Sequence, residues 1–167
     1  MAHVWLIGMM GSGKTSVGRI LADQLEVPFY DTDATVEANA GMGITEIFER
    51  YGETRFRELE AKAVRAIASQ DDGVVSTGGG VVLDPSNVEV MRASGRTILL
   101  DVDTDTLVER LGAVSDRPLV SDDPEGRLRE IAAAREDNYR MAADVVVDAT
   151  GSIEEVVHRV EAACSES

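Results

Sequence analysis

Cysteine, histidine and lysine are all scarce in this sequence of 167 residues. The single cysteine, Cys164, cannot form an internal disulfide or a cysteine-based zinc cluster. Two histidines, His3 and His158, argue against a histidine metal site. Only two lysines are present, Lys14 and Lys62, and the other fourteen positively charged side chains are arginines.

Long hydrophobic runs are also missing, and none approaches the roughly eighteen apolar residues that a membrane span needs. The N-terminus has no positively charged segment, and its short apolar stretch leads directly into a glycine-rich sequence, which argues against a signal peptide. We expect one cytoplasmic domain spanning residues 1–167, because a second domain would leave each half short of core.

Positive charge is outweighed by negative charge, which gives a formal net charge of −15. Such a surface repels nucleic acids and anionic membranes, so neither is an expected partner. It repels nucleotides and small carboxylates as well. A site for such anions would have to be built locally, from backbone N–H groups and a few arginines or lysines. The acidic surface of one compact domain makes a monomer the expected state.

Short apolar strands alternate with helical patterns along the chain. The expected strands are 4–7, 28–31, 74–76, 96–102 and 144–147, and the expected helices are 14–25, 34–40, 44–50, 53–69, 86–93, 104–111, 125–141 and 152–163. This alternation predicts an α/β fold with a five-stranded parallel sheet and helices on both faces. Ligands bind at the carboxyl ends of strands in such sheets, so the polar residues after each strand should converge.

Residues 8–15 read GMMGSGKT and match the phosphate-loop pattern G-x-x-x-x-G-K-[ST] in full. They follow a strand and open a helix, as that motif requires. Glycines let backbone N–H groups turn toward an anion, Lys14 can reach the β- and γ-phosphates, and the Thr15 hydroxyl can bind Mg²⁺. The alternative is a glycine-rich turn that binds nothing. Lysine stands only at positions 14 and 62, so the N-K-x-D segment of most GTPases is absent, and a small metabolite or nucleotide kinase remains.

The segments after the next two expected strands contain candidate residues for binding the substrate that accepts the phosphoryl group. Asp31 and Asp33 repel each other unless a cation or proton donor lies near, so Mg²⁺ and a substrate hydroxyl could engage them. In the alternative interpretation they form a solvated turn in which Asp33 caps the following helix. Gly78, Gly79 and Gly80 indicate either close approach of a ligand to the backbone or simply a tight turn.

Three arginines are candidate anion partners. Arg57 flanks a buried helical stripe, where Glu53 and Glu60 can hold its guanidinium as a fork for a carboxylate. Arg117 lies in a polar loop that could act as a lid over about residues 112–124, and Arg135 lies on the following helix. Each could equally be a solvated or ion-paired surface residue.

The ordered set GMMGSGKT, DTD, FRELE, STGGG, DRPL and a later helical arginine resembles the shikimate kinase family over about residues 3–160. The combination of DTD, FRxxE and GGG is more specific than the phosphate loop, which gluconate and adenylate kinases share. The resemblance implies the three-layer fold of phosphate-loop kinases. It also implies ATP-dependent phosphorylation of shikimate to 3-phosphoshikimate, a step toward chorismate and the aromatic amino acids, with Mg²⁺ as cofactor.

The resemblance also implies residue roles. ATP would be bound by Gly11, Ser12, Gly13, Lys14, Thr15, Ser16, Arg110 and Arg117, and shikimate by Asp33, Arg57, Gly78, Gly79, Gly80 and Arg135. Catalysis would rest on Lys14, Asp33 and Arg117. The metal would be bound by Thr15 and, through water, by Asp31.

Two departures from the family pattern stand out. Relatives often have R-x-P-x-Y where this chain has Asp137 in place of proline, two residues after Arg135. Many relatives also carry an arginine in the turn after the last strand, where residues 148–152 here read DATGS. A kinase of another hydroxy acid such as gluconate, and a nucleotide-binding regulator without catalysis, remain the alternative functions.

Overall fold

The computed structural model describes residues 2–112 and 123–166. Its sheet is built from strands β1 (His3–Ile7), β2 (Phe29–Asp31), β3 (Val74–Ser76), β4 (Gly95–Asp101) and β5 (Val145–Asp148). The order is β2-β3-β1-β4-β5, and every neighbouring pair is parallel. This confirms the predicted five-stranded parallel sheet.

The helices are α1 (Lys14–Leu25), α2 (Thr32–Ala40), α3 (Ile44–Ala68), α4 (Pro85–Ser94), α5 (Thr104–Gly112), α6 (Pro124–Ala142) and α7 (Ile153–Ser165), with a short 3-10 helix η1 (Val81–Leu83). No helix within residues 2–112 and 123–166 is apolar over a length that could cross a membrane.

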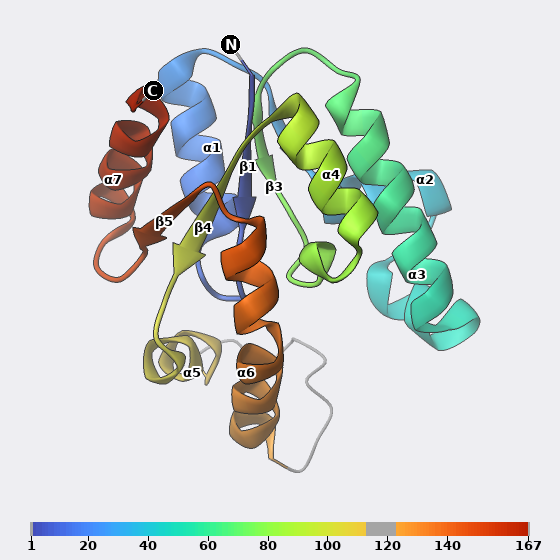
Figure 1. Ribbon diagram of the computed structural model, residues 1–167. Coiled ribbons are helices and arrows are strands. Elements are labelled where there is room, and N and C mark those ends of the chain that lie inside the picture. The colour runs from blue at the N-terminus through green and yellow to red at the C-terminus, as the bar shows by residue number, and fades with distance from the viewer. Residues whose placement is uncertain (1, 113–122, 167) are drawn as a thin grey trace.

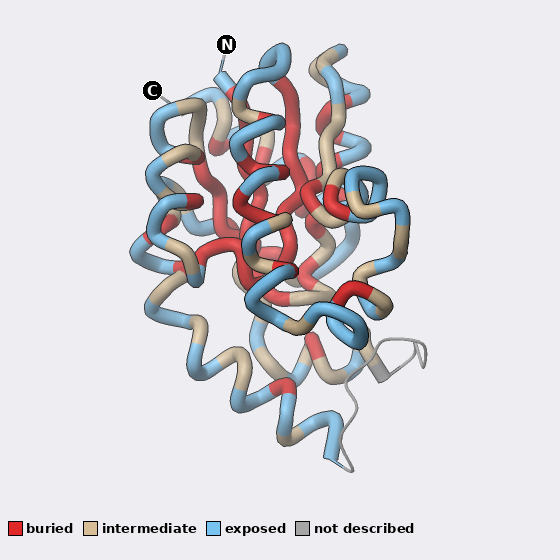
Figure 2. Tube along the Cα trace, turned by 90° about the vertical axis from the view of Figure 1, so that its right-hand side faces the viewer, coloured by how far each residue is buried: buried red, intermediate tan, exposed pale blue. Residues whose placement is uncertain are grey.

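Alternate residues of β1 enter the two core layers, since side chains of a strand point alternately to opposite faces. Val4 and Leu6 pack with α1 and α7. Trp5 and Ile7 pack on the other face with α3, α4 and α6. The sheet thus lies between two helical layers (Figure 1), and the buried part of the chain runs through the middle of the molecule (Figure 2).

The carboxyl ends of the strands point to one edge of the sheet, at the bottom of Figure 1. The chain leaves β1 to form β2 and β3 on one side, and later β4 and β5 on the other. β1 is therefore the point at which the strand order reverses, and ligands bind at the carboxyl end of such a strand. The loop that follows β1 is the phosphate loop.

Most element boundaries differ from the sequence prediction by one or two residues. The two helices expected at 44–50 and 53–69 are the two parts of α3, which meet at a kink at Gly52, where φ of 82° and ψ of 175° are not helical. Helix α2 begins at Thr32 instead of Ala34, because Asp31 caps it. The 3-10 helix at Val81–Leu83 was not predicted.

Gly95 provides a test of the sheet, because it pairs with His3 where β4 begins. A methyl group at Gly95 would collide with the His3 carbonyl oxygen, which belongs to the backbone and cannot rotate away. We predict that Gly95→Ala lowers the free energy of unfolding by about 1–3 kcal/mol in urea denaturation. Gly43→Ala is the control, because its methyl group would meet only the flexible end of Glu37. Equal midpoints for the two variants would contradict the β1–β4 register.

Candidate active site

The phosphate loop is shaped by glycines in backbone conformations that other residues rarely adopt. Gly8, Gly11 and Gly13 have φ of 145°, 83° and 97°. Gly13 precedes α1, and none of the described side chains caps that helix. The first turn of α1 therefore points its N–H groups and positive dipole end into the loop, which suits an anion.

Lys14 lies within this loop with only 8% of its surface exposed. Its ammonium donates to the Gly8 carbonyl at 2.7 Å and to the Met9 carbonyl at 3.0 Å. The backbone thus holds the ammonium beside the loop. Ser12, 2% exposed, has a buried hydroxyl for which the described residues provide no hydrogen-bond partner.

A cleft of about 410 Å³ joins the phosphate loop to the segments that follow β2 and β3. It is lined by Met10, Gly11, Gly13, Lys14, Thr15, Ser16, Asp31, Asp33, Ser76, Thr77 and Gly79. The structure therefore brings together most of the residues that the sequence predicted for nucleotide, metal and acceptor.

Asp31 and Thr15 both lie beside Ser76. The Thr15 and Ser76 hydroxyls are 3.2 Å apart, and Asp31 stands opposite Ser76 in the β2–β3 pairing. Asp31 Oδ1 accepts hydrogen bonds from the backbone N–H groups of Asp33 and Ala34, at 2.9 and 3.1 Å. The helix cap is therefore Asp31, and the alternative in which Asp33 caps α2 is wrong.

Asp33 faces the cleft as a half-buried carboxyl. Burial raises its pKa above the ordinary value, and the Asp31 carboxylate raises it further, while the Lys14 ammonium and the Arg57 guanidinium pull it down. The position thus favours a proton or a hydrogen-bond donor on Asp33 more than a solvated turn would.

Arg57 is held as the sequence predicted, by a glutamate on each side along α3. Its guanidinium lies 3.0 Å from Glu60 Oε1 and 3.5 Å from Glu53 Oε1. Glu60 is 1% exposed, and its Oε2 is buried without a hydrogen-bond partner in the described structure. Burial raises the pKa of Glu60, against which Arg57 is the largest opposing influence. This is no solvated surface pair.

The three glycines after β3 leave room for side chains of the site. A methyl group at Gly78 would lie 2.8 Å from Asp33 Oδ1, one at Gly79 would lie 3.3 Å from an Arg135 nitrogen, and one at Gly80 would collide with the Arg57 guanidinium. None of the three, all in the described part of the chain, has a positive φ. At Gly78 and Gly80, space for the side chains of the site, and not turn geometry, favours glycine.

Two residues that hold this glycine segment were missed by the sequence analysis. Thr32 is fully buried, and its hydroxyl accepts a hydrogen bond from the Gly78 N–H at 2.9 Å. The Tyr139 hydroxyl donates to the Gly79 carbonyl and lies 3.6 Å from Met9 Sδ. A threonine between two aspartates, and a tyrosine one helical turn after Arg135, are the signals that could have identified them.

The remaining predicted residues lie around this centre. Arg135 faces Gly79 from α6, which continues as one helix through Asp137. Arg110 lies on the opposite side, where it donates to the Gly11 carbonyl at 3.0 Å and to the Ala149 carbonyl at 2.9 Å. Arg117 and most of the expected lid lie outside the described residues.

Comparison with known proteins gives one consistent result. The family model for shikimate kinase matches residues 10–165. A shikimate kinase of Symbiobacterium thermophilum is 48% identical over 86% of this chain and 84% of the relative. Another, of Caldanaerobacter subterraneus subsp. tengcongensis, is 44% identical over 96% of this chain and 94% of the relative.

Solved structures agree with the sequence relatives. Shikimate kinase from Acinetobacter baumannii, in complex with shikimate, superposes with a TM-score of 0.91 at 31% identity, covering 96% of this chain and 91% of that one. A gluconokinase from Sinorhizobium meliloti reaches a TM-score of 0.63 at 20% identity, covering 98% and 91%, and shares the fold alone. With the phosphate loop, the DTD, FRELE and GGG segments and these matches together, the chain belongs to the shikimate kinase family, whose members are ATP-dependent kinases.

Proposed function

We propose that this protein transfers the γ-phosphoryl group of ATP to a hydroxyl of shikimate and so forms ADP and 3-phosphoshikimate. The observation that carries the proposal is the single cleft in which the phosphate loop meets Asp33 and the glycine segment. The arginines beside that segment, Arg57 and Arg135, supply the positive charge that an anionic acceptor needs in so acidic a protein.

On the nucleotide side, we assign phosphate binding to Gly11, Ser12, Gly13, Lys14, Thr15 and Ser16. Their N–H groups and the α1 dipole suit the phosphates. Lys14 would exchange the carbonyl oxygens of the loop for phosphate oxygens when ATP binds. We assign Arg110 to the nucleoside side. A charge-stabilising role for Arg117, and a lid over about residues 112–124, rest on the family resemblance alone.

Mg²⁺ fits the residues that are present. Within residues 2–112 and 123–166 there is no group of three carboxylate, histidine or cysteine side chains that could hold a metal. Thr15 and Asp31, which flank Ser76, offer oxygen ligands beside the phosphate loop. Mg²⁺ usually keeps several waters and binds through one or two protein oxygens and the substrate phosphates. Bound in this way, it would neutralise charge on the transferring phosphoryl group.

On the acceptor side, we assign the shikimate carboxylate to Arg57 and Arg135, which face the adjacent residues Gly80 and Gly79. Glu60 holds Nη1 of Arg57 at 3.0 Å and so fixes the direction of the guanidinium, whose remaining N–H groups would be offered to the ligand. The backbone of Gly78, Gly79 and Gly80 lets the ring approach closely. The reacting hydroxyl would donate to Asp33, between the ring and Lys14.

Asp33 would then orient the hydroxyl and accept its proton as the phosphoryl group arrives. A raised pKa suits that task, because a carboxylate that resists ionisation takes up a proton more readily. Phosphoryl transfer needs little help from a base, so positioning and charge stabilisation supply most of the rate. We propose that the chain works as a single-domain, cytoplasmic monomer.

The acceptor is tested by a coupled ADP-release assay with Mg-ATP and shikimate, gluconate or AMP. We expect shikimate-dependent turnover, and no release above the ATP-only background with gluconate or AMP, because only shikimate presents a ring beside its carboxylate. Turnover with gluconate would contradict the proposed substrate. ADP binding without any turnover would indicate a nucleotide-binding regulator instead.

Asp33→Asn tests the role of the buried carboxyl. We predict a loss in kcat of about 100-fold or more with ADP affinity retained, because the phosphate loop is untouched.

The same substitution should raise the stability of the fold while it lowers activity. The folded pKa of Asp33 lies above the unfolded value of 3.8, so its charged form destabilises the fold at neutral pH.

The variant should therefore have a higher free energy of unfolding at pH 7, and this gain should vanish below about pH 3.8, where the carboxyl is protonated in both states. Urea denaturation across pH measures it, with the exposed Asp23→Asn on α1 as control. Unchanged kcat, or a parallel loss of ADP affinity, would refute the assignment of Asp33.

A further inference from the structure

The turn that follows β5 is held by arginines from two different helices. Arg159, on α7, donates to the Asp148 carbonyl at 2.9 Å and to the Thr150 carbonyl at 2.7 Å. Arg110, on α5, donates to the Ala149 carbonyl between them at 2.9 Å. Three consecutive carbonyls thus point at guanidinium groups, which fixes the direction of the turn backbone.

The turn is also braced from within. The Asp148 carboxylate accepts hydrogen bonds from the N–H and hydroxyl of Thr150, at 3.0 and 2.6 Å. These bonds lower the pKa of Asp148, so it stays charged. Arg159 is oriented by Glu155, one helical turn before it, at 3.3 Å. The residues 148–151 therefore form a shaped segment and not a loose connection.

One guanidinium joins this turn to the phosphate loop. The second nitrogen of Arg110 donates to the Gly11 carbonyl at 3.0 Å. The next residue of α5, Leu111, packs closely on Gly11. A methyl group added to Gly11 would lie 3.2 Å from Cγ of Leu111. A displacement of the turn would therefore shift the Arg110 guanidinium, and with it the hydrogen bond to the phosphate loop.

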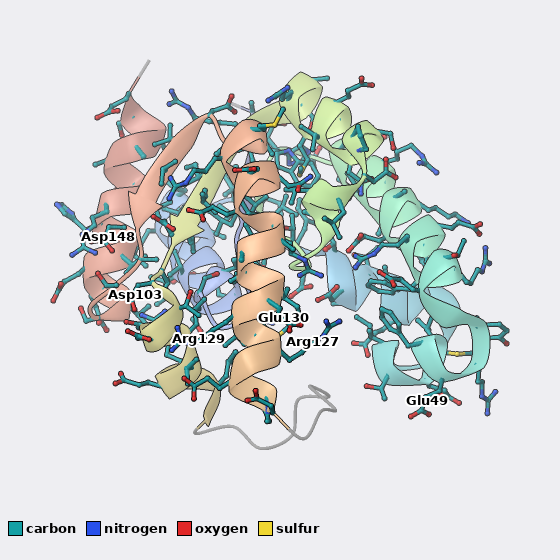
Figure 3. All side chains as sticks on the ribbon, turned by 60° about the horizontal axis from the view of Figure 1, so that its bottom comes forward. Glu49, Asp103, Arg127, Arg129, Glu130 and Asp148 are labelled. Carbon is teal, nitrogen blue, oxygen red and sulfur yellow. The ribbon has the colours of Figure 1, made fainter. Side chains whose placement is uncertain are left out.

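The nucleoside of ATP must extend toward this turn. The acceptor groups, Asp33 and the glycine segment, lie on the β2–β3 side of the phosphate loop. A nucleotide that presents its γ-phosphate to that side carries its ribose and base away from it, over the ends of β4 and β5. Figure 3 shows Asp103 and Asp148, the residues near those two strand ends, on this same side of the molecule.

We propose that Arg159 is a positioning residue for the nucleoside of ATP. It acts through the turn 148–151, whose backbone it holds against Arg110, so that turn and guanidinium together present a preformed surface to the base and ribose. This inference rests on the nucleotide part of the proposed function, and it is independent of the acceptor. Arg159 lies on α7, outside every motif of the sequence analysis.

The test compares two ligands that share phosphates but differ in the nucleoside. Isothermal titration measures MgADP and Mg-tripolyphosphate binding to the unaltered chain, Arg159→Ala and Arg159→Lys, without shikimate. We expect Arg159→Ala to weaken MgADP binding about fivefold to tenfold and to leave tripolyphosphate binding within about twofold. Arg159→Lys should recover most of the loss, because an ammonium can still donate to both carbonyls.

Arg50→Ala is the matched control, since Arg50 forms a similar exposed i,i+4 ion pair, with Glu46 on α3. Steady-state kinetics add a second readout, in which KM for ATP rises while kcat and KM for shikimate stay unchanged. Unchanged MgADP affinity in Arg159→Ala would overturn the proposal, and so would equal weakening of both ligands. If the unaltered chain binds MgADP but does not phosphorylate shikimate, the proposed acceptor fails while this inference is still decided by the titration.

Discussion

Space above Gly78, Gly79 and Gly80 is the constraint on which the acceptor side of the molecule depends. A single methyl group at any of the three would meet Asp33, Arg135 or Arg57. The side chains that converge on this segment come from α2, α3 and α6, three helices far apart in sequence. Thr32 and Tyr139 hold its backbone in place through Gly78 and Gly79. The backbone of these three glycines thus stays free of side chains, so that charged groups, and then a ligand, can approach it.

Charge explains why these groups are so firmly held. The protein has a net charge of −15, yet its proposed substrates are both anions. The positive charge is therefore concentrated and braced: Lys14 lies buried on loop carbonyls, and Arg57 is fixed by a glutamate that is 1% exposed. A buried carboxylate beside an arginine is a poor source of stability, because desolvation offsets the attraction. Its value here is that it fixes the direction of a guanidinium fork.

The layers of the fold could be predicted from the sequence because the three central strands, β1, β3 and β4, are short apolar runs that are largely buried on both faces. The phosphate loop could be predicted because its glycines and Lys14 are required by one backbone shape. Convergence of the segments after β1, β2 and β3 followed from the parallel sheet. The residues that fix the backbone of the glycine segment were harder to predict. Thr32 and Tyr139 each act through a single hydrogen bond, to residues 46 and 60 positions away in the sequence. Local patterns carry no signal for such distant pairs.

Local features of single residues explain the remaining details of the fold and the site. Asp31 and Asp33 are both able to cap a helix, and only the extended backbone at Asp31 decided between them. Gly52 breaks the helical geometry within α3, so the two helices expected on either side of it are found as two segments that meet at a kink. Arg159 had no motif to mark it, since its role depends on the turn after β5 folding back toward α7.

The carboxylate clamp is the central claim of this account, and shikimate methyl ester tests it most directly. The ester keeps the ring and its hydroxyls but removes the charge that Arg57 and Arg135 would bind. We expect a KM for the ester at least about tenfold above that for shikimate, and a loss of about 2–5 kcal/mol in shikimate binding for Arg57→Ala. The preference for the acid should shrink in that variant. Equal KM values for acid and ester, or an undiminished preference in Arg57→Ala, would contradict the clamp.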